Sequence, residues 1–84
     1  MSSLSDLKEE FRRAKVDFRW RDFVRLLGML GYEQAKPGRT GGSRRTFFHP
    51  LTNHVIKDHE PHDGRMYRAQ IKRLKAALES EGLL

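Results

Sequence analysis

The sequence predicts an α+β domain in which two helices pack on one face of a three-stranded antiparallel sheet, with an extra helix at the N-terminus. Three observations support this fold class. Apolar residues recur at helical spacing in three segments of the chain. Between the second and third of these segments, short apolar runs are separated by turn-forming residues, as in antiparallel strands. The length of 84 residues limits the chain to one small domain, and two helices on one sheet face bury both apolar surfaces.

The first helical segment is interpreted as an accessory to the domain. Residues 15–19 read as the connection out of it. We therefore expect an accessory N-terminal helix and connection over residues 1–19, and the domain proper over residues 20–84. The apolar residues of this helix recur at helical spacing, at Leu4, Leu7, Phe11 and Ala14.

The second helix is expected to follow directly, with Gly31 as its terminator. Residues 32–35 form a plausible short strand. The stretch over residues 36–42 is rich in Gly and Pro and can only be a loop. The inward face of the helix is predicted to consist of Trp20, Phe23, Leu27 and Leu30.

A β-hairpin is predicted next, with strands at residues 44–49 and 54–57 joined by a turn at residues 50–53. Side chains alternate across a strand, so we expect one of Phe47 and Phe48 to be buried and the other exposed. An exposed phenylalanine beside arginine could stack on an unpaired base, although a covering helix or partner is the commoner arrangement.

The last helix is predicted to begin near Gly64 or Arg65, with Asp63 as a candidate N-cap, and to end at Gly82. Residues 58–63 are expected to form the loop before it. Its apolar stripe is predicted from helical spacing to consist of Tyr67, Ile71, Leu74 and Leu78.

The charge of the chain favours an acidic partner. Lys and Arg total 17 against 11 Asp and Glu, which gives a net charge of +6. Most of these cations are arginine, whose planar fork matches phosphate oxygens. A nucleic acid is therefore one predicted partner. A basic protein without such a partner is the alternative.

Composition also excludes several classes of protein. The chain has no cysteine, which excludes disulfides, thiolate nucleophiles and Cys-type zinc sites and is compatible with a reducing cytosol. No apolar run approaches the length of a membrane span, and the first residues do not read as a signal peptide. We expect a cytoplasmic protein with no membrane partner.

Two basic features are predicted to form one RNA-binding surface. The first is the flexible loop that ends in Gly42 and Ser43, followed by Arg44 and Arg45 at the start of a strand. The second lies on the last helix, where four cations at i, i+3, i+7 and i+10 share one strip; a solvated helix face is the alternative. The residues of this strip are Arg65, Arg68, Lys72 and Lys75.

A series of short motifs follows in order from residue 20 to residue 83. It consists of Trp20-Arg21-Asp22-Phe23, Leu30-Gly31-Tyr32, Gly42-Ser43-Arg44, Phe47-Phe48-His49-Pro50, Val55-Ile56, His59-Glu60-Pro61-His62, and a closing helix with Ile71, Leu74 and Glu81-Gly82-Leu83. This order resembles that of HicA-like toxins. The resemblance implies a fold like double-stranded-RNA-binding domains (dsRBD-like), mRNA interferase activity within a toxin–antitoxin system, and neutralisation by a HicB-like antitoxin.

The chain departs from this family at one position. Arg44 stands where the family has the histidine that carries its ribonuclease activity. A guanidinium can hold a phosphate or stabilise a charged transition state, but it cannot take up a proton. His59 matches the loop histidine of the family and is the best candidate for a general base, with His62 next. His49 and His54 flank the hairpin turn, where a polar and exposed role is expected.

Other functions stay open at this point. Two histidines and a carboxylate between Asp58 and Asp63 could bind a metal ion, but the segment has no helix to hold that geometry, so we expect no metal and no cofactor. Ser43 has no visible activating pair and is a weaker nucleophile candidate. A non-catalytic RNA- or antitoxin-binding module on the same fold is the main alternative to a nuclease. An adaptor that binds no nucleic acid is the third.

Overall fold

Three helices and two antiparallel sheets make up the structure, a computed structural model that describes residues 3–36 and 42–84. The predicted loop lies largely outside the described residues, at positions 37–41. None of the helices in the described ranges is long and apolar enough to cross a bilayer. In chain order the elements are α1 (Leu4–Arg13), β1 (Asp17–Arg19), α2 (Trp20–Met29), β2 (Glu33–Gln34), β3 (Arg44–Phe48), β4 (Val55–His59), β5 (Arg65–Tyr67) and α3 (Arg68–Ser80).

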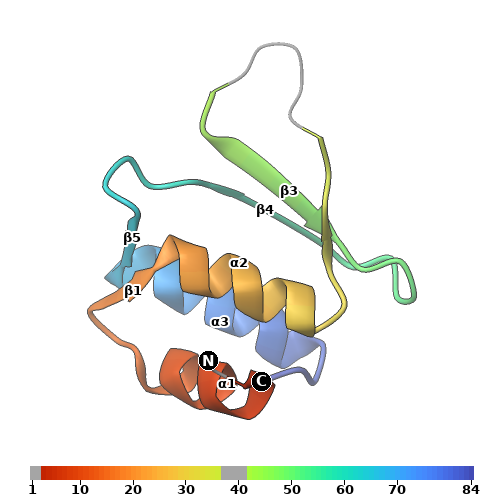
Figure 1. Cartoon of the computed structure of the whole chain (residues 1–84), viewed down its shortest axis with the longest axis horizontal. Helices are drawn as coiled ribbons and strands as arrows, with labels where there is room; N and C mark the ends of the chain where they lie inside the picture. Colours follow the sequence, from red (N-terminus) through yellow and green to blue (C-terminus); the bar gives the residue numbers. More distant parts are fainter. Residues whose placement is uncertain (1–2, 37–41) are drawn as a thin grey trace.

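The larger sheet has the strand order β2-β3-β4, and both strand pairs are antiparallel. Helices α2 and α3 lie on one face of this sheet, and α1 packs on the far side of the two helices (Figure 1). The α+β class and the three-stranded antiparallel sheet are therefore confirmed. The hairpin turn is also where the sequence predicts it, and Asn53 closes it with a φ of 63°, a backbone angle that asparagine tolerates well.

A second, two-stranded sheet was not predicted. Residues 15–19 were interpreted as a connection, but Asp17–Arg19 forms β1 and pairs with β5. Phe18 lies opposite Met66, which is fully buried. Three residues are too few for an alternating pattern to be recognised. The partner strand is also nearly fifty positions away, so no local turn signal indicates the pairing.

The start of the last helix was predicted too early. Helix α3 begins at Arg68 with Tyr67 as its N-cap, so Asp63 is not the cap. The Asp63 carboxylate instead accepts a hydrogen bond from the Arg65 backbone N–H at 3.0 Å and from the Tyr67 hydroxyl at 2.6 Å. An aspartate that closes a turn makes the same kind of side-chain-to-backbone bond as an N-cap, so sequence alone does not separate the two roles.

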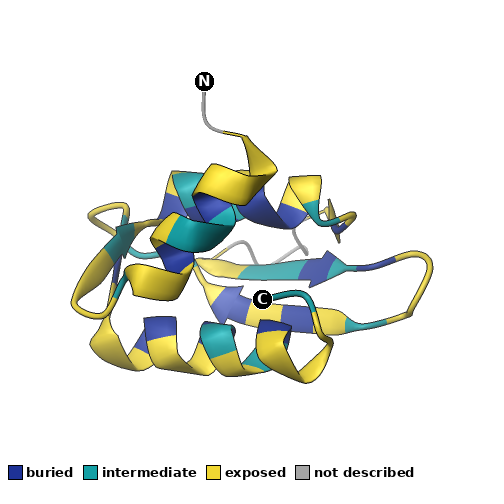
Figure 2. Ribbon diagram, turned by 90° about the horizontal axis from the view of Figure 1, so that it is seen from below, coloured by how far each residue is buried: buried dark blue, intermediate teal, exposed yellow. Residues whose placement is uncertain are grey.

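One apolar core joins all three helices to the larger sheet. Buried residues line the inner faces of the elements and meet between them (Figure 2). The Phe11 ring of α1 lies 5.3 Å from the ring of Phe23 in α2. Trp20 of α2 lies 6.0 Å from Phe47 of β3. Phe47 is buried and Phe48 is partly exposed, as the alternation predicts, and the predicted core positions Trp20 and Phe23 are confirmed.

His49 is buried in the structure, so the expectation of an exposed role was wrong. Its Nε2 lies 3.1 Å from the carbonyl oxygen of Leu30, and its Nδ1 accepts from the backbone N–H of Leu51 at 3.3 Å. This pair of contacts fits a neutral ring with its proton on Nε2. The ring also packs edge-on against Tyr32. His49 therefore ties the end of α2 to the hairpin turn.

Gly31 is required where the chain leaves α2, and we expect Gly31→Ala to destabilise the protein by about 2–4 kcal/mol. Its φ is +101°, and an added Cβ would lie 2.7 Å from Nε2 of the buried His49 ring. Denaturant unfolding measures the loss. Gly28→Ala is the matched control, because a Cβ there meets nothing within 4 Å and gains up to about 1 kcal/mol of helix propensity. Equal stability of the Gly31→Ala and wild-type proteins would contradict this prediction.

Candidate functional site

The open end of the β3–β4 hairpin brings together the two segments that the sequence singled out. Arg44 at the start of β3 lies directly opposite His59 at the end of β4. Residues that are paired in this way project from the same face of a sheet, with Cβ atoms about 5 Å apart. The Glu60 backbone N–H donates to the Ser43 carbonyl at 2.7 Å and continues the pairing beyond the strands. Arg44 and His59 are both exposed.

Arg45 has a different role from Arg44. Its Nε lies 3.1 Å from a carboxylate oxygen of Glu60, and its Nη1 donates to the carbonyl of Gly42 at 2.9 Å. Arg45 therefore holds the chain on both sides of the strand entrance and leaves Arg44 as the exposed guanidinium. These residues border a shallow depression, the Gly-Ser hollow, which is lined by Gly42, Ser43, Arg45, Glu60, Pro61 and His62.

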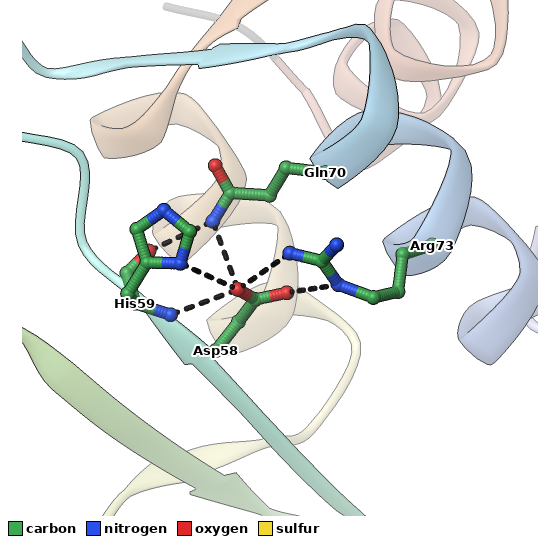
Figure 3. A network of polar contacts seen from close by, with 4 residues as sticks. All are labelled: Asp58, His59, Gln70 and Arg73. Carbon is green, nitrogen blue, oxygen red and sulfur yellow. Dashed lines mark hydrogen bonds and ion pairs between the residues drawn. The ribbon is translucent and has the colours of Figure 1, made fainter.

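A buried carboxylate lies behind His59 (Figure 3). The Asp58 side chain is only 5% exposed and points toward α3. Arg73 donates to both of its oxygens, from Nε to Oδ2 at 3.0 Å and from Nη2 to Oδ1 at 2.9 Å. Gln70 Nε2 donates to Oδ1 at 3.1 Å and to the carbonyl of His59 at 2.7 Å. The His59 backbone N–H also donates to Oδ1, at 2.8 Å.

These contacts keep Asp58 ionised. Burial raises the pKa of Asp58. The hydrogen bonds from Arg73, from the His59 backbone and from Gln70, together with the Arg73 charge, outweigh this effect, so the pKa lies below its usual value. The same pair raises the pKa of Arg73, chiefly through its hydrogen bond to Asp58. A buried carboxylate with both oxygens satisfied, held by a bidentate arginine, is a fixed element of structure, although the Arg73 side chain itself is 55% exposed.

His59 stands between this carboxylate and solvent. Its ring Nδ1 lies 3.2 Å from Asp58 Oδ1, and the side chain is 57% exposed. His59 and His62 border a second depression, the histidine hollow, between the β4–β5 loop and α3. Tyr67 and Arg73 also line it. The hollow thus has two imidazoles, two guanidiniums, a phenol and the Asp63 carboxylate along its walls. The cationic groups suit an anionic ligand, and the imidazoles suit proton transfer.

The predicted basic strip is not continuous along α3, although Arg65 lines the histidine hollow. Arg65 belongs to β5 and pairs with Asp17 of β1, so it is not on the helix. The Lys75 ammonium donates to the backbone carbonyls of Arg12 and Ala14 at the end of α1. Gln70 and Arg73, by contrast, reach β4 from the opposite flank of α3. Arg68 and Lys72 are exposed, and their binding of RNA stays a prediction.

The side chains of the alternative metal set are not arranged to share an ion. In the two described ranges no three histidine, aspartate or glutamate side chains converge as metal ligands would. The Asp58 carboxylate is directed into its contacts with α3, and the Asp63 carboxylate accepts from Arg65 and Tyr67. The donor set therefore does not fit a metal centre.

The network of Asp58, Gln70 and Arg73 was missed at the level of sequence. One signal was available. The strand was predicted to end at residue 57 and Asp58 was assigned to the following loop, which was wrong, because β4 continues to His59. Ile56 and Asp58 are two positions apart on this strand, so both face the same side of the sheet. Ile56 is buried, and a carboxylate on that side needs a cationic partner. The partner could not be named, because Arg73 lies fifteen positions away on a helix whose rotation was not known.

Comparison with known proteins identifies no relative of this chain. No family model matches the chain, and neither a curated protein nor a solved structure matches it.

Proposed function

We propose that this chain is a HicA-like toxin that cuts mRNA without a metal ion and is neutralised by a HicB-like antitoxin. The observation that carries the proposal is the cross-strand pair of Arg44 and His59. The two positions that match functional residues of the family lie fifteen residues apart in sequence but face each other across β3 and β4. This arrangement supports a guanidinium that holds a phosphate beside an imidazole that moves a proton.

The arrangement of the domain also supports the proposal. From α2 to α3 the chain has two helices on one face of a three-stranded antiparallel sheet, which is the order expected of a dsRBD-like domain. The additional β1–β5 pair lies at the end of the two helices. In the proposed toxin, the strand entrance at Gly42 and Ser43 and the open face of the sheet remain available to RNA.

The proposed reaction is an internal transfer at one RNA phosphate. His59 takes the proton from the ribose 2′-OH, the 2′-oxygen forms a bond to phosphorus, and the bond from phosphorus to the 5′-oxygen breaks. His62, which lines the same hollow, returns a proton to the leaving oxygen. Arg44 stabilises the charge that develops on the phosphoryl oxygens. The products are a 2′,3′-cyclic phosphate and a 5′-hydroxyl.

Incubation of the purified protein with single-stranded RNA in the presence of EDTA tests this function. We expect cleavage and a 2′,3′-cyclic phosphate end. Induced expression is expected to arrest growth, and co-expression of a small antitoxin from a neighbouring gene is expected to relieve the arrest. RNA binding without any cleavage would favour the alternative of a non-catalytic RNA- or antitoxin-binding module. Absent or salt-insensitive RNA binding would contradict both and favour an adaptor.

Arg44→Ala is expected to weaken RNA binding to a similar extent for every sequence. A lost phosphate contact also reduces the slope of log K against log salt by about 1. Fluorescence anisotropy at several salt concentrations measures both quantities. Arg13→Ala is the control, because Arg13 is an exposed arginine of α1, on the side of the helices away from the sheet. An equal change of RNA affinity and salt slope in both variants would mean that Arg44 contributes only to the net positive charge and makes no phosphate contact of its own.

A further inference from the structure

We propose that Asp58 is the positioning residue of His59, and that Gln70 and Arg73 of α3 hold Asp58 in place for this role. The inference rests on the proposed function, because it assigns a partner to the proton-transfer group of the same site. It concerns a carboxylate that does not touch RNA and that acts only through the imidazole.

The geometry gives Asp58 one fixed orientation. Its two oxygens receive a two-pronged contact from Arg73 and further donors from the Gln70 side chain and the His59 backbone. The side chain is almost completely buried, so solvent does not compete for these positions. Loops carry many functional groups, but here the orienting group lies on a strand and is clamped by a helix.

The position of His59 identifies the ring atom that faces the carboxylate. Its Nδ1 is the ring nitrogen that lies 3.2 Å from Asp58 Oδ1. A carboxylate at that nitrogen favours the tautomer that carries its proton on Nδ1 and leaves the Nε2 lone pair free. Nε2 is then the atom that accepts the proton of the 2′-OH. When it does so, the positive charge of the ring forms next to an ionised carboxylate and is stabilised.

Gln70 adds a second constraint. The same amide nitrogen donates to Asp58 and to the backbone carbonyl of His59, so it links the carboxylate to the backbone that carries the imidazole. Rotation of α3 or a shift of β4 would disturb both contacts together. The contact between β4 and α3 therefore fixes the backbone position from which the His59 ring extends.

The tautomer of His59 tests this inference without any RNA. In long-range ¹⁵N–¹H NMR spectra of the wild-type protein, at a pH where the ring is neutral, we expect the proton on Nδ1. In Asp58→Asn we expect that preference to be lost. Glu60→Gln is the matched control, since it replaces a nearby carboxylate that pairs with a different arginine, Arg45, and it should leave the tautomer unchanged.

Kinetics test the consequence for the reaction. We expect Asp58→Asn to lower kcat by about 10- to 100-fold, a part of what acid–base catalysis contributes, while KM changes little. Arg73→Lys keeps a cation near Asp58 and is expected to recover part of the rate compared with Arg73→Ala. Glu10→Gln, at an exposed position of α1, is the kinetic control, and uniform loss of kcat in all folded variants including this one would overturn the proposal.

The two measurements separate this inference from the proposed function. Wild-type protein with its ring proton on Nε2, or an unchanged tautomer in Asp58→Asn, overturns the inference whether or not RNA is cut. A changed tautomer with unchanged kcat also overturns it. If the wild type cuts no RNA, the proposed function fails, and the NMR result alone decides whether Asp58 positions the ring. The wild-type spectrum needs no variant, so a poorly folded Asp58→Asn protein does not prevent the test.

Discussion

His59→Ala is expected to lower the rate of RNA cleavage by about 10²- to 10⁴-fold, the usual contribution of a positioned acid–base group. RNA binding is expected to change little, because Arg44 remains as the exposed cation at the strand entrance. The His59 side chain is more than half exposed, so its removal leaves no large cavity. Single-turnover cleavage and anisotropy binding, measured on the same preparations, separate the two effects.

Two further measurements strengthen this test. His54→Gln is the control, because it removes another imidazole of the same hairpin and keeps an acceptor for the Tyr32 hydroxyl, which lies 2.6 Å from His54 Nδ1. It should cut at nearly the wild-type rate. Added imidazole should restore part of the activity of His59→Ala. A His59→Ala protein that cuts RNA at the wild-type rate would contradict the assigned role.

Phe11→Ala is expected to reduce the free energy of unfolding by about 3–5 kcal/mol, as other large-to-small core changes do. Phe11 is 0% exposed, and its ring packs on Phe18 and Phe23 at 5.0 and 5.3 Å. A small domain has about 5–15 kcal/mol in total, so this loss is a large fraction of its stability. Urea or thermal unfolding followed by circular dichroism measures the change.

Leu4→Ala provides the control within the same helix. Leu4 is 36% exposed, so its truncation should cost less than about 1 kcal/mol. A similarly small effect of Phe11→Ala would mean that α1 is an accessory to a domain that is stable without it, as the sequence analysis expected. A large effect limited to Phe11 would make α1 an integral part of the domain.

Local patterns were sufficient for most of the fold. The apolar spacing of Trp20, Phe23 and Leu27 located α2. The turn predicted at residues 50–53 located the hairpin, with each strand end placed to within two residues. Local patterns could not predict the pairing of strands that are far apart in the sequence. The β1–β5 sheet and the late start of α3 are two aspects of one fact, namely that Arg65–Tyr67 pairs with a strand near the N-terminus and so does not join the helix.

In the candidate site, too, local patterns predicted some features and long-range contacts decided the others. Arg44 and His59 were both named from sequence, but His59 was expected in the loop after the strand. In the structure β4 extends to His59, and the hairpin register places it opposite Arg44. The position of the basic strip depended on the rotation and starting point of α3, and both were unknown. Lys75, which was expected to bind RNA, contacts α1 instead, and Arg73, which was not singled out, makes the contact to β4.

The contacts between the two ends of the chain have a consequence for synthesis of the protein. The Lys75 ammonium holds the end of α1, and β1 pairs with β5, so these contacts of the first residues come from residues 65–75, although Phe11 also packs on the nearby Phe23. During synthesis, the β1–β5 pair and the Lys75 contact cannot form until residues 65–75 have been translated. Such long-range closure slows folding, and in the proposed toxin it delays the assembly of an active molecule until this part of the chain has been made.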